Sequence, residues 1–142
     1  MAIVSRFEDL AAWQKARMLS RAVFESSSRG AFQRDSSLAG QLNTSTASVA
    51  SKIAEGYDRG NLTEFSRFLV IAKGLCAESR SHLYIALDRQ HLTEGEFAIL
   101  HDQAEEVARV IAGLLSTIRR QVSGAGVPVS SAGAGPDQLS PS

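Results

Sequence analysis

Histidine and cysteine are the side chains that most often do chemistry near neutral pH, and this sequence has few of them. The histidines are His82, His91 and His101, and Cys76 is the single cysteine. His82 follows Glu78 by four residues, so on a helix the two share a face. This spacing favours a hydrogen bond, with a metal pair as the alternative. Cys76 has no histidine at helical spacing, so we interpret it as a small core residue rather than a nucleophile.

The known catalytic motifs are missing from the chain. It contains no phosphate-binding loop, dinucleotide-binding glycine pattern, nucleophile elbow or HExxH zinc motif. A di-iron site in a helical bundle requires Glu-x-x-His on two helices, and no glutamate here has a histidine three residues later. We therefore expect no enzyme activity, no catalytic residue, no metal site and no cofactor.

Long helices are expected to position these residues. Pro128 is the first proline of the chain, so nothing before it interrupts a helix. The apolar spacing predicts four helices, which begin after Phe7–Asp9, near Ser36, at Asn61 and at Thr93. Thr93 with Glu96 forms a capping box, and Gly56 or Gly60 provides the left-handed cap that ends the second helix.

The apolar stripes of these helices define the expected core. They comprise Ala12, Trp13, Ala16, Leu19, Val23 and Phe24; Leu38, Leu42, Ser45, Val49 and Ile53; Phe65, Phe68, Leu69, Ala72, Leu75, Cys76, Ser79, Leu83 and Ala86; and Phe97, Leu100, Ala104, Val107, Ile111, Leu114 and Ile118. The predicted class is all-α: residues 1–122 form one antiparallel up-down four-helix bundle. Residues 123–142, rich in Gly, Ser, Ala and Pro, are expected to be a disordered tail.

Charge gives no overall attraction to a polyanion. Lys and Arg number 15, and so do Asp and Glu, so the net charge is zero. Seven basic residues are candidate phosphate contacts, with a mixed solvated surface as the alternative: Lys15, Arg17, Arg21, Lys52, Arg59, Arg119 and Arg120. No apolar run approaches the ~20 residues of a membrane span. We see no signal peptide and expect a cytoplasmic protein.

Two groups of residues lie outside the core pattern. Arg67, Ile71, Gly74 and Glu78 fall on one helix face, where Gly74 would permit close approach of another backbone. We predict that Arg67, Gly74 and Glu78 line a subunit interface, with Glu55 as a charge partner; a solvated face is the alternative. Glu55-Gly56-Tyr57 either ends a helix or makes an intersubunit or ligand contact.

Three short segments resemble a bacterial family of four-helix bundle proteins. They are Phe7-Glu8-Asp9-Leu10 with Trp13-Gln14-Lys15-Ala16; Ile53-Ala54-Glu55-Gly56-Tyr57 with Phe65-Ser66-Arg67-Phe68-Leu69; and Ala72, Gly74, Leu75 and Glu78. Many members of this family are encoded in intervening sequences of large-subunit ribosomal RNA genes and carry the label of ribosomal proteins.

The resemblance implies a ring-shaped homopentamer. It also implies a relation to the accessory protein of diversity-generating retroelements, a basic pentamer that binds a reverse transcriptase and nucleic acid. The family usually has basic residues where this chain has Asn43 and Thr44, which argues for weaker nucleic-acid binding here. The leading hypothesis is a non-catalytic homo-oligomeric scaffold, with RNA, DNA or a reverse transcriptase as its candidate partners. The alternative is an oligomer that binds only protein.

Overall fold

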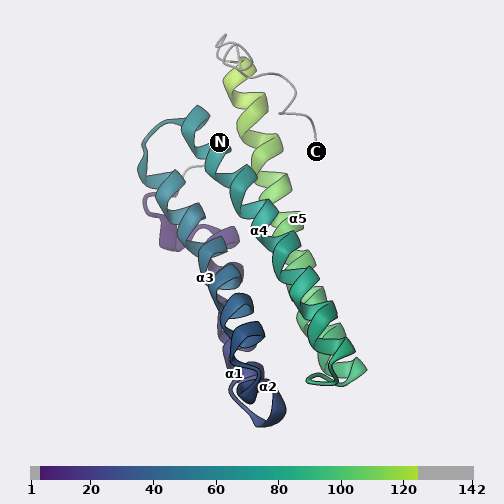
Figure 1. The fold of residues 1–142 in the computed structure, drawn as a ribbon. Helices are drawn as coiled ribbons and strands as arrows, with labels where there is room; N and C mark the ends of the chain where they lie inside the picture. Colours follow the sequence, from purple (N-terminus) through teal and green to yellow (C-terminus); the bar gives the residue numbers. More distant parts are fainter. Residues whose placement is uncertain (1–3, 125–142) are drawn as a thin grey trace.

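The computed structural model describes residues 4–124. In chain order its elements are η1 (Phe7–Asp9), α1 (Ala11–Ser27), α2 (Gly30–Arg34), α3 (Ser36–Asp58), α4 (Leu62–Asp88) and α5 (Glu94–Gly124). No strand occurs within this range, so the predicted all-α class is confirmed. The long helices α1, α3, α4 and α5 form the predicted up-down bundle, and none of the described helices is long and apolar enough to cross a membrane (Figure 1).

The helix starts follow the capping signals of the sequence. The Thr93 hydroxyl accepts a hydrogen bond from the backbone N–H of Glu96 at 3.1 Å, and the Glu96 carboxylate accepts one from the N–H of Thr93 at 2.9 Å. Asn61 caps α4 by accepting from the N–H of Glu64 at 2.9 Å. The start of α3 is also as predicted, but its capping residue, Asp35, was not predicted.

Each long helix packs against two neighbours, and the order around the bundle is α1, α3, α4, α5. The core between them is continuous, and most of the predicted stripes are buried. One predicted core position is wrong. Phe24 is 62% exposed, because the neighbouring face of α3 carries alanines that are too short to cover it. On α5, the predicted Leu114 is partly buried against the core, and the next residue, Leu115, which was not predicted, is buried.

Helix α2 is an addition to the predicted four helices. It occupies the connection between α1 and α3, and its Phe32 is buried. At the other end, α5 continues to Gly124, so Ser123 and Gly124 belong to this helix rather than to the predicted tail. The remainder of that predicted tail, residues 125–142, lies outside the described residues.

Candidate interaction surfaces

The corner between α3 and α4 contains the motif Glu55-Gly56-Tyr57. Gly56 lies inside α3 and is buried. A Cβ added at Gly56 would lie 2.5 Å from the Cβ of Phe68 and 3.1 Å from Cδ1 of Phe65, so only glycine permits this approach of the two helices. The residue with positive φ is Gly60, at 76°, which follows the end of α3. Of the two glycines considered for the left-handed cap, Gly60 therefore has the required conformation.

The side chains of Tyr57 and Glu55 make different contacts at this corner. The Tyr57 hydroxyl donates a hydrogen bond to the carbonyl of Val4, and its ring packs edge-on against Phe65 with centroids 5.7 Å apart. Tyr57 thus ties the beginning of the chain to the bundle. Glu55 is exposed and pairs with Lys52 at 3.3 Å. Within one chain, Glu55 forms no ion pair with Arg67 among the described contacts.

The outer face of α4, defined here as Arg67, Val70, Ile71, Gly74 and Glu78, points away from the core. Val70 is 42% exposed and Ile71 49% exposed, which is unusual for large aliphatic side chains that lie side by side. A Cβ at Gly74 would meet nothing within 4 Å. At the ends of the face, Arg67 pairs with Glu64 at 3.6 Å and Glu78 with His82 at 3.4 Å. The structure thus brings the three predicted interface residues of α4 onto one exposed surface.

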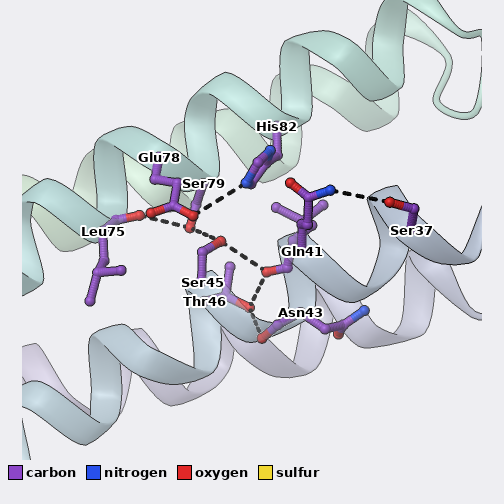
Figure 2. A network of polar contacts seen from close by, with 10 residues as sticks. Ser37, Gln41, Asn43, Ser45, Thr46, Leu75, Glu78, Ser79 and His82 are labelled. Carbon is purple, nitrogen blue, oxygen red and sulfur yellow. Dashed lines mark hydrogen bonds and ion pairs between the residues drawn. The ribbon is translucent and has the colours of Figure 1, made fainter.

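A layer of hydroxyl groups crosses the interior between α3 and α4 (Figure 2). The hydroxyls of Ser45 and Ser79, both buried, lie 2.8 Å apart. Each hydroxyl also lies within hydrogen-bond distance of a carbonyl of its own helix, Ser45 of Leu42 and Ser79 of Leu75. Because a hydroxyl carries one proton, one serine donates to the other, and the serine that accepts donates to its own carbonyl. Every one of these groups has a partner, so we interpret the layer as a structural contact. On the surface nearby, His82 and Glu78 make the predicted side-chain contact (Figure 2).

An open groove of about 800 Å³ runs between α1 and α3. We define this α1–α3 groove by Trp13, Arg17, Arg21 and Phe24 on α1 and by Ala47 and Ala50 on α3. The arginines are the charged residues of its lining, and no acidic residue lines it. The sequence showed that α3 is rich in small residues, but it placed Trp13 and Phe24 in the core. The groove could not be found without knowing that α3 leaves Phe24 exposed and Trp13 only half-buried.

Several of the seven predicted phosphate contacts have side-chain partners within the chain. Lys15 pairs with Glu106 at 3.7 Å, Arg21 with Glu25 at 3.8 Å and Lys52 with Glu55 at 3.3 Å. Arg120 donates to the hydroxyls of Ser116 and Thr117. The Nε of Arg119 is buried without a hydrogen-bond partner among the described residues.

Two of the arginines lie against aromatic rings instead. The guanidinium of Arg17 is 5.6 Å from the ring centre of Trp13, and that of Arg59 is 4.8 Å from the ring centre of Phe68. Lys52 approaches the same Phe68 ring at 6.0 Å. Phe68 and Trp13 are half-buried, so part of each ring stays accessible. Trp13 and Phe68 were predicted to be core residues, and their rings also contact arginines on the surface.

Two histidine clusters were not predicted. The Asp35 carboxylate lies 2.9 Å from Nε2 of His91 and 2.9 Å from Nη1 of Arg89, which links the start of α3 to the α4–α5 connection. His91 and then Arg89 hold the pKa of Asp35 below its usual value. Separately, His101, Asp102 and Glu105 offer ligand atoms within 4.8 Å of one another. They come from one turn of α5, and no other observation points to a metal there.

Cys76 is fully buried between helices. Burial raises the pKa of its thiol to about 11, because the thiolate would lose its hydration in the core. The group is therefore protonated and shielded at neutral pH, as expected of a core cysteine.

These features define a helical-bundle protein with one continuous apolar core and with exposed apolar and charged groups on its outer helix faces. The family model described as the 23S rRNA-intervening sequence protein matches residues 8–113, and the chain belongs to this family. The resemblance noted in the sequence is thereby confirmed. No curated protein matches the sequence. The relation to the retroelement accessory protein stays a prediction.

Proposed function

We propose that this chain is a non-catalytic, cytoplasmic scaffold that assembles from several identical copies, five in the ring that the family resemblance implies. The observation that supports self-assembly best is the outer face of α4. It has the apolar side chains of a packed surface, Val70 and Ile71, beside a glycine that leaves room for a partner. The single cysteine, which has no partner for an intrachain disulfide, suits a reducing compartment.

Burial of this face would stabilise an oligomer appreciably. Complete burial of an aliphatic side chain contributes roughly 1.5–3 kcal/mol, and Val70 and Ile71 are still about half exposed. Each would add about 1 kcal/mol per interface on this scale. A ring repeats the gain at every subunit boundary. The face alone does not supply a tight interface, so neighbouring surfaces must contribute as well.

The non-catalytic part of the proposal rests on the interior. Its buried hydroxyls, those of Ser27, Ser45, Thr46 and Ser79, all make hydrogen bonds within the helices or to each other. The Cys76 thiol is held in its protonated form. None of these groups lies beside a base that would activate it.

A second candidate function is binding of RNA or DNA, or of a reverse transcriptase together with its nucleic acid. The observation that favours it is the placement of basic groups on accessible aromatic rings, above all Arg59 and Lys52 at Phe68. Such pairs contact phosphates and stack bases with little sequence preference. The competing candidate is a scaffold that binds only protein, which the zero net charge and the paired Lys15, Lys52 and Arg21 favour.

The self-assembly proposal is tested by comparing two matched substitutions. Ile71→Asp places a charge on the outer face of α4, and Ile99→Asp places the same charge on another helix, at a position of α5 that is 63% exposed. We expect light scattering to show a multi-subunit wild type, the same mass for Ile99→Asp and a reduced mass for Ile71→Asp. Circular dichroism must show equal helix content in all three. A monomeric wild type would refute the proposal.

The nucleic-acid candidate is tested by gel shift against RNA and DNA over a salt series. Binding through phosphates must weaken steeply with salt, because each contact releases counterions. At one salt concentration, Arg59→Gln should reduce the retardation relative to the wild type. Arg109→Gln, on α5 and paired with Glu106 at 2.7 Å, should leave the retardation unchanged. If no retardation occurs at low salt, the scaffold binds only protein.

A further inference from the structure

The α1–α3 groove combines an apolar floor, aromatic walls and two arginines, and no acidic side chain lines it. We propose that this groove binds an acidic amphipathic helix of a partner protein. The inference rests on the proposed scaffold function and names the chemistry of the partner. It does not depend on how many copies of the chain assemble, because every residue that it uses belongs to one copy.

The groove has the dimensions of a seat for one helix. Its lining residues on α1 run from Trp13 to Phe24, which is about 17 Å at ~1.5 Å per residue, or about three helical turns. Opposite them, Asn43, Ala47 and Ala50 form a low row along α3. Side chains this short permit another helix to approach to the usual distance of roughly 8–10 Å between axes.

Contacts within the chain fix both ends of the groove. At one end, the Phe7 ring packs edge-on against Trp13, with ring centroids 5.3 Å apart. Towards the other end, the Asn43 amide donates a hydrogen bond to the Ser27 hydroxyl at 2.8 Å, which joins α3 to α1. A partner helix would therefore meet a surface that two packed helices already hold in place, and its binding would order little of this chain.

The charges of the groove select an acidic partner. Arg17 forms no ion pair among the described residues, and its guanidinium lies 5.6 Å from the ring centre of Trp13. Arg21 pairs with Glu25 at 3.8 Å, but the two side chains are 79% and 65% exposed, so this pair contributes little. Because Arg17 and Arg21 lie one turn apart, carboxylates one turn apart on a partner helix would contact both.

The apolar part of the groove would supply the affinity. Phe24 is 62% exposed, Trp13 is half-buried, and Ala47 and Ala50 lie across from them. Leucine or isoleucine side chains of a partner would fill the space above the alanines and cover the Phe24 ring. Recognition of a helix in a groove uses apolar anchors at i, i+4 and i+7 in this way. The partner helix thus has an apolar stripe towards α3 and carboxylates towards α1.

A protein helix fits this groove better than RNA or DNA does. The guanidinium of Arg17 lies over the ring of Trp13, where a base would have to stack. The alanines of α3 have no side-chain donor for a phosphate. The Asn43 amide already donates to Ser27 and to the carbonyl of Ala39. The groove therefore offers few phosphate contacts for its apolar area.

Trp13 is the single tryptophan of the chain, so its fluorescence reports on the groove directly. The probe is a synthetic peptide of about four helical turns without aromatic residues, with leucines at i, i+4 and i+7 and glutamates one turn apart beside them. Added to the full chain, it should shift the Trp13 emission to shorter wavelength in a saturable manner and gain helix content. A peptide of scrambled order, and one with lysine for each glutamate, should give no shift.

Variants of the chain locate the binding, which is measured by the fluorescence anisotropy of a labelled peptide. Ala47→Glu, at an exposed position of the groove, should abolish binding, whereas Ala98→Glu, at an exposed position of α5, should retain it. Arg17→Gln should weaken binding about tenfold, because it removes one partner of a charge pair at the interface, and Arg109→Gln on α5 should not. Circular dichroism must show wild-type helix content in all four variants.

The inference is overturned if the glutamate peptide leaves the Trp13 emission unchanged, if either control peptide binds as tightly, or if Ala47→Glu keeps wild-type affinity. Single-stranded RNA that binds the groove more tightly than the peptide at the same salt would make it a nucleic-acid site instead. A reduced mass of Ala47→Glu in light scattering would assign the groove to contacts between copies. A monomeric wild type that binds the peptide would refute self-assembly alone, so the two failures are distinguishable.

Discussion

Replacement of Gly56 by alanine should destabilise the bundle, although alanine is the better helix former. A Cβ at this position would lie 2.5 Å from the Cβ of Phe68, whose place is fixed by the backbone of α4. Ordinary carbon–carbon contacts are about 3.5–4.0 Å, so α3 and α4 must separate by about 1 Å. Overpacking of this kind costs up to about 3 kcal/mol. The gain in helix propensity offsets ~1 kcal/mol, which leaves a net loss of about 2 kcal/mol.

The matched control is Gly40→Ala in the same helix. Gly40 is exposed, and a Cβ there would meet nothing within 4 Å. Alanine should therefore raise the free energy of unfolding by up to ~1 kcal/mol. Urea unfolding of both variants at one protein concentration would place their midpoints on opposite sides of the wild type. A midpoint for Gly56→Ala at or above that of the wild type would show that α3 and α4 do not approach each other as closely at Gly56 as described.

Three further predictions concern the interior and the α3 cap. A double-mutant cycle of Ser45→Ala and Ser79→Ala should give a coupling energy of about 0.5–1.5 kcal/mol, since the two hydroxyls share a hydrogen bond; additive losses would contradict that contact. Because His91 lowers the pKa of Asp35 in the folded state, this group stabilises the fold above its unfolded pKa of about 3.9, and the contribution is lost as pH falls through the lower folded value. Asp35→Asn should reduce the fall in the free energy of unfolding below pH ~4. An unchanged pH dependence would argue against the contacts of Asp35 with His91 and Arg89. Cys76, with a pKa of about 11, should resist iodoacetamide at pH 8 until denaturant is added, and rapid labelling of the native protein would contradict its burial.

The helices could be predicted because local signals and core patterns agree. Thr93 and Glu96 form the capping box that their spacing predicts, and Asn61 caps α4. Helix α2 could not be predicted in the same way. Its five residues are too few for a periodic pattern, and its one anchor, Phe32, is buried only through tertiary packing.

The surfaces were only partly predictable. Arg67, Gly74 and Glu78 fall on one face because helical spacing alone determines it, and the structure places them there. Phe24 follows the apolar stripe of α1 equally well, yet it is exposed because the α3 residues beside it are short: Asn43, Ala47 and Ala50. The α1–α3 groove depends on which residues of two helices meet, and that pairing is not encoded in the periodicity of either helix.

The central claim is that the outer face of α4 joins copies of the same chain. Native mass spectrometry of the full chain over a dilution series tests it most directly. The account predicts one closed species of five copies, the ring that the family resemblance implies, with no ladder of larger assemblies, because a closed ring leaves no free interface. A single monomer peak at all concentrations would contradict it.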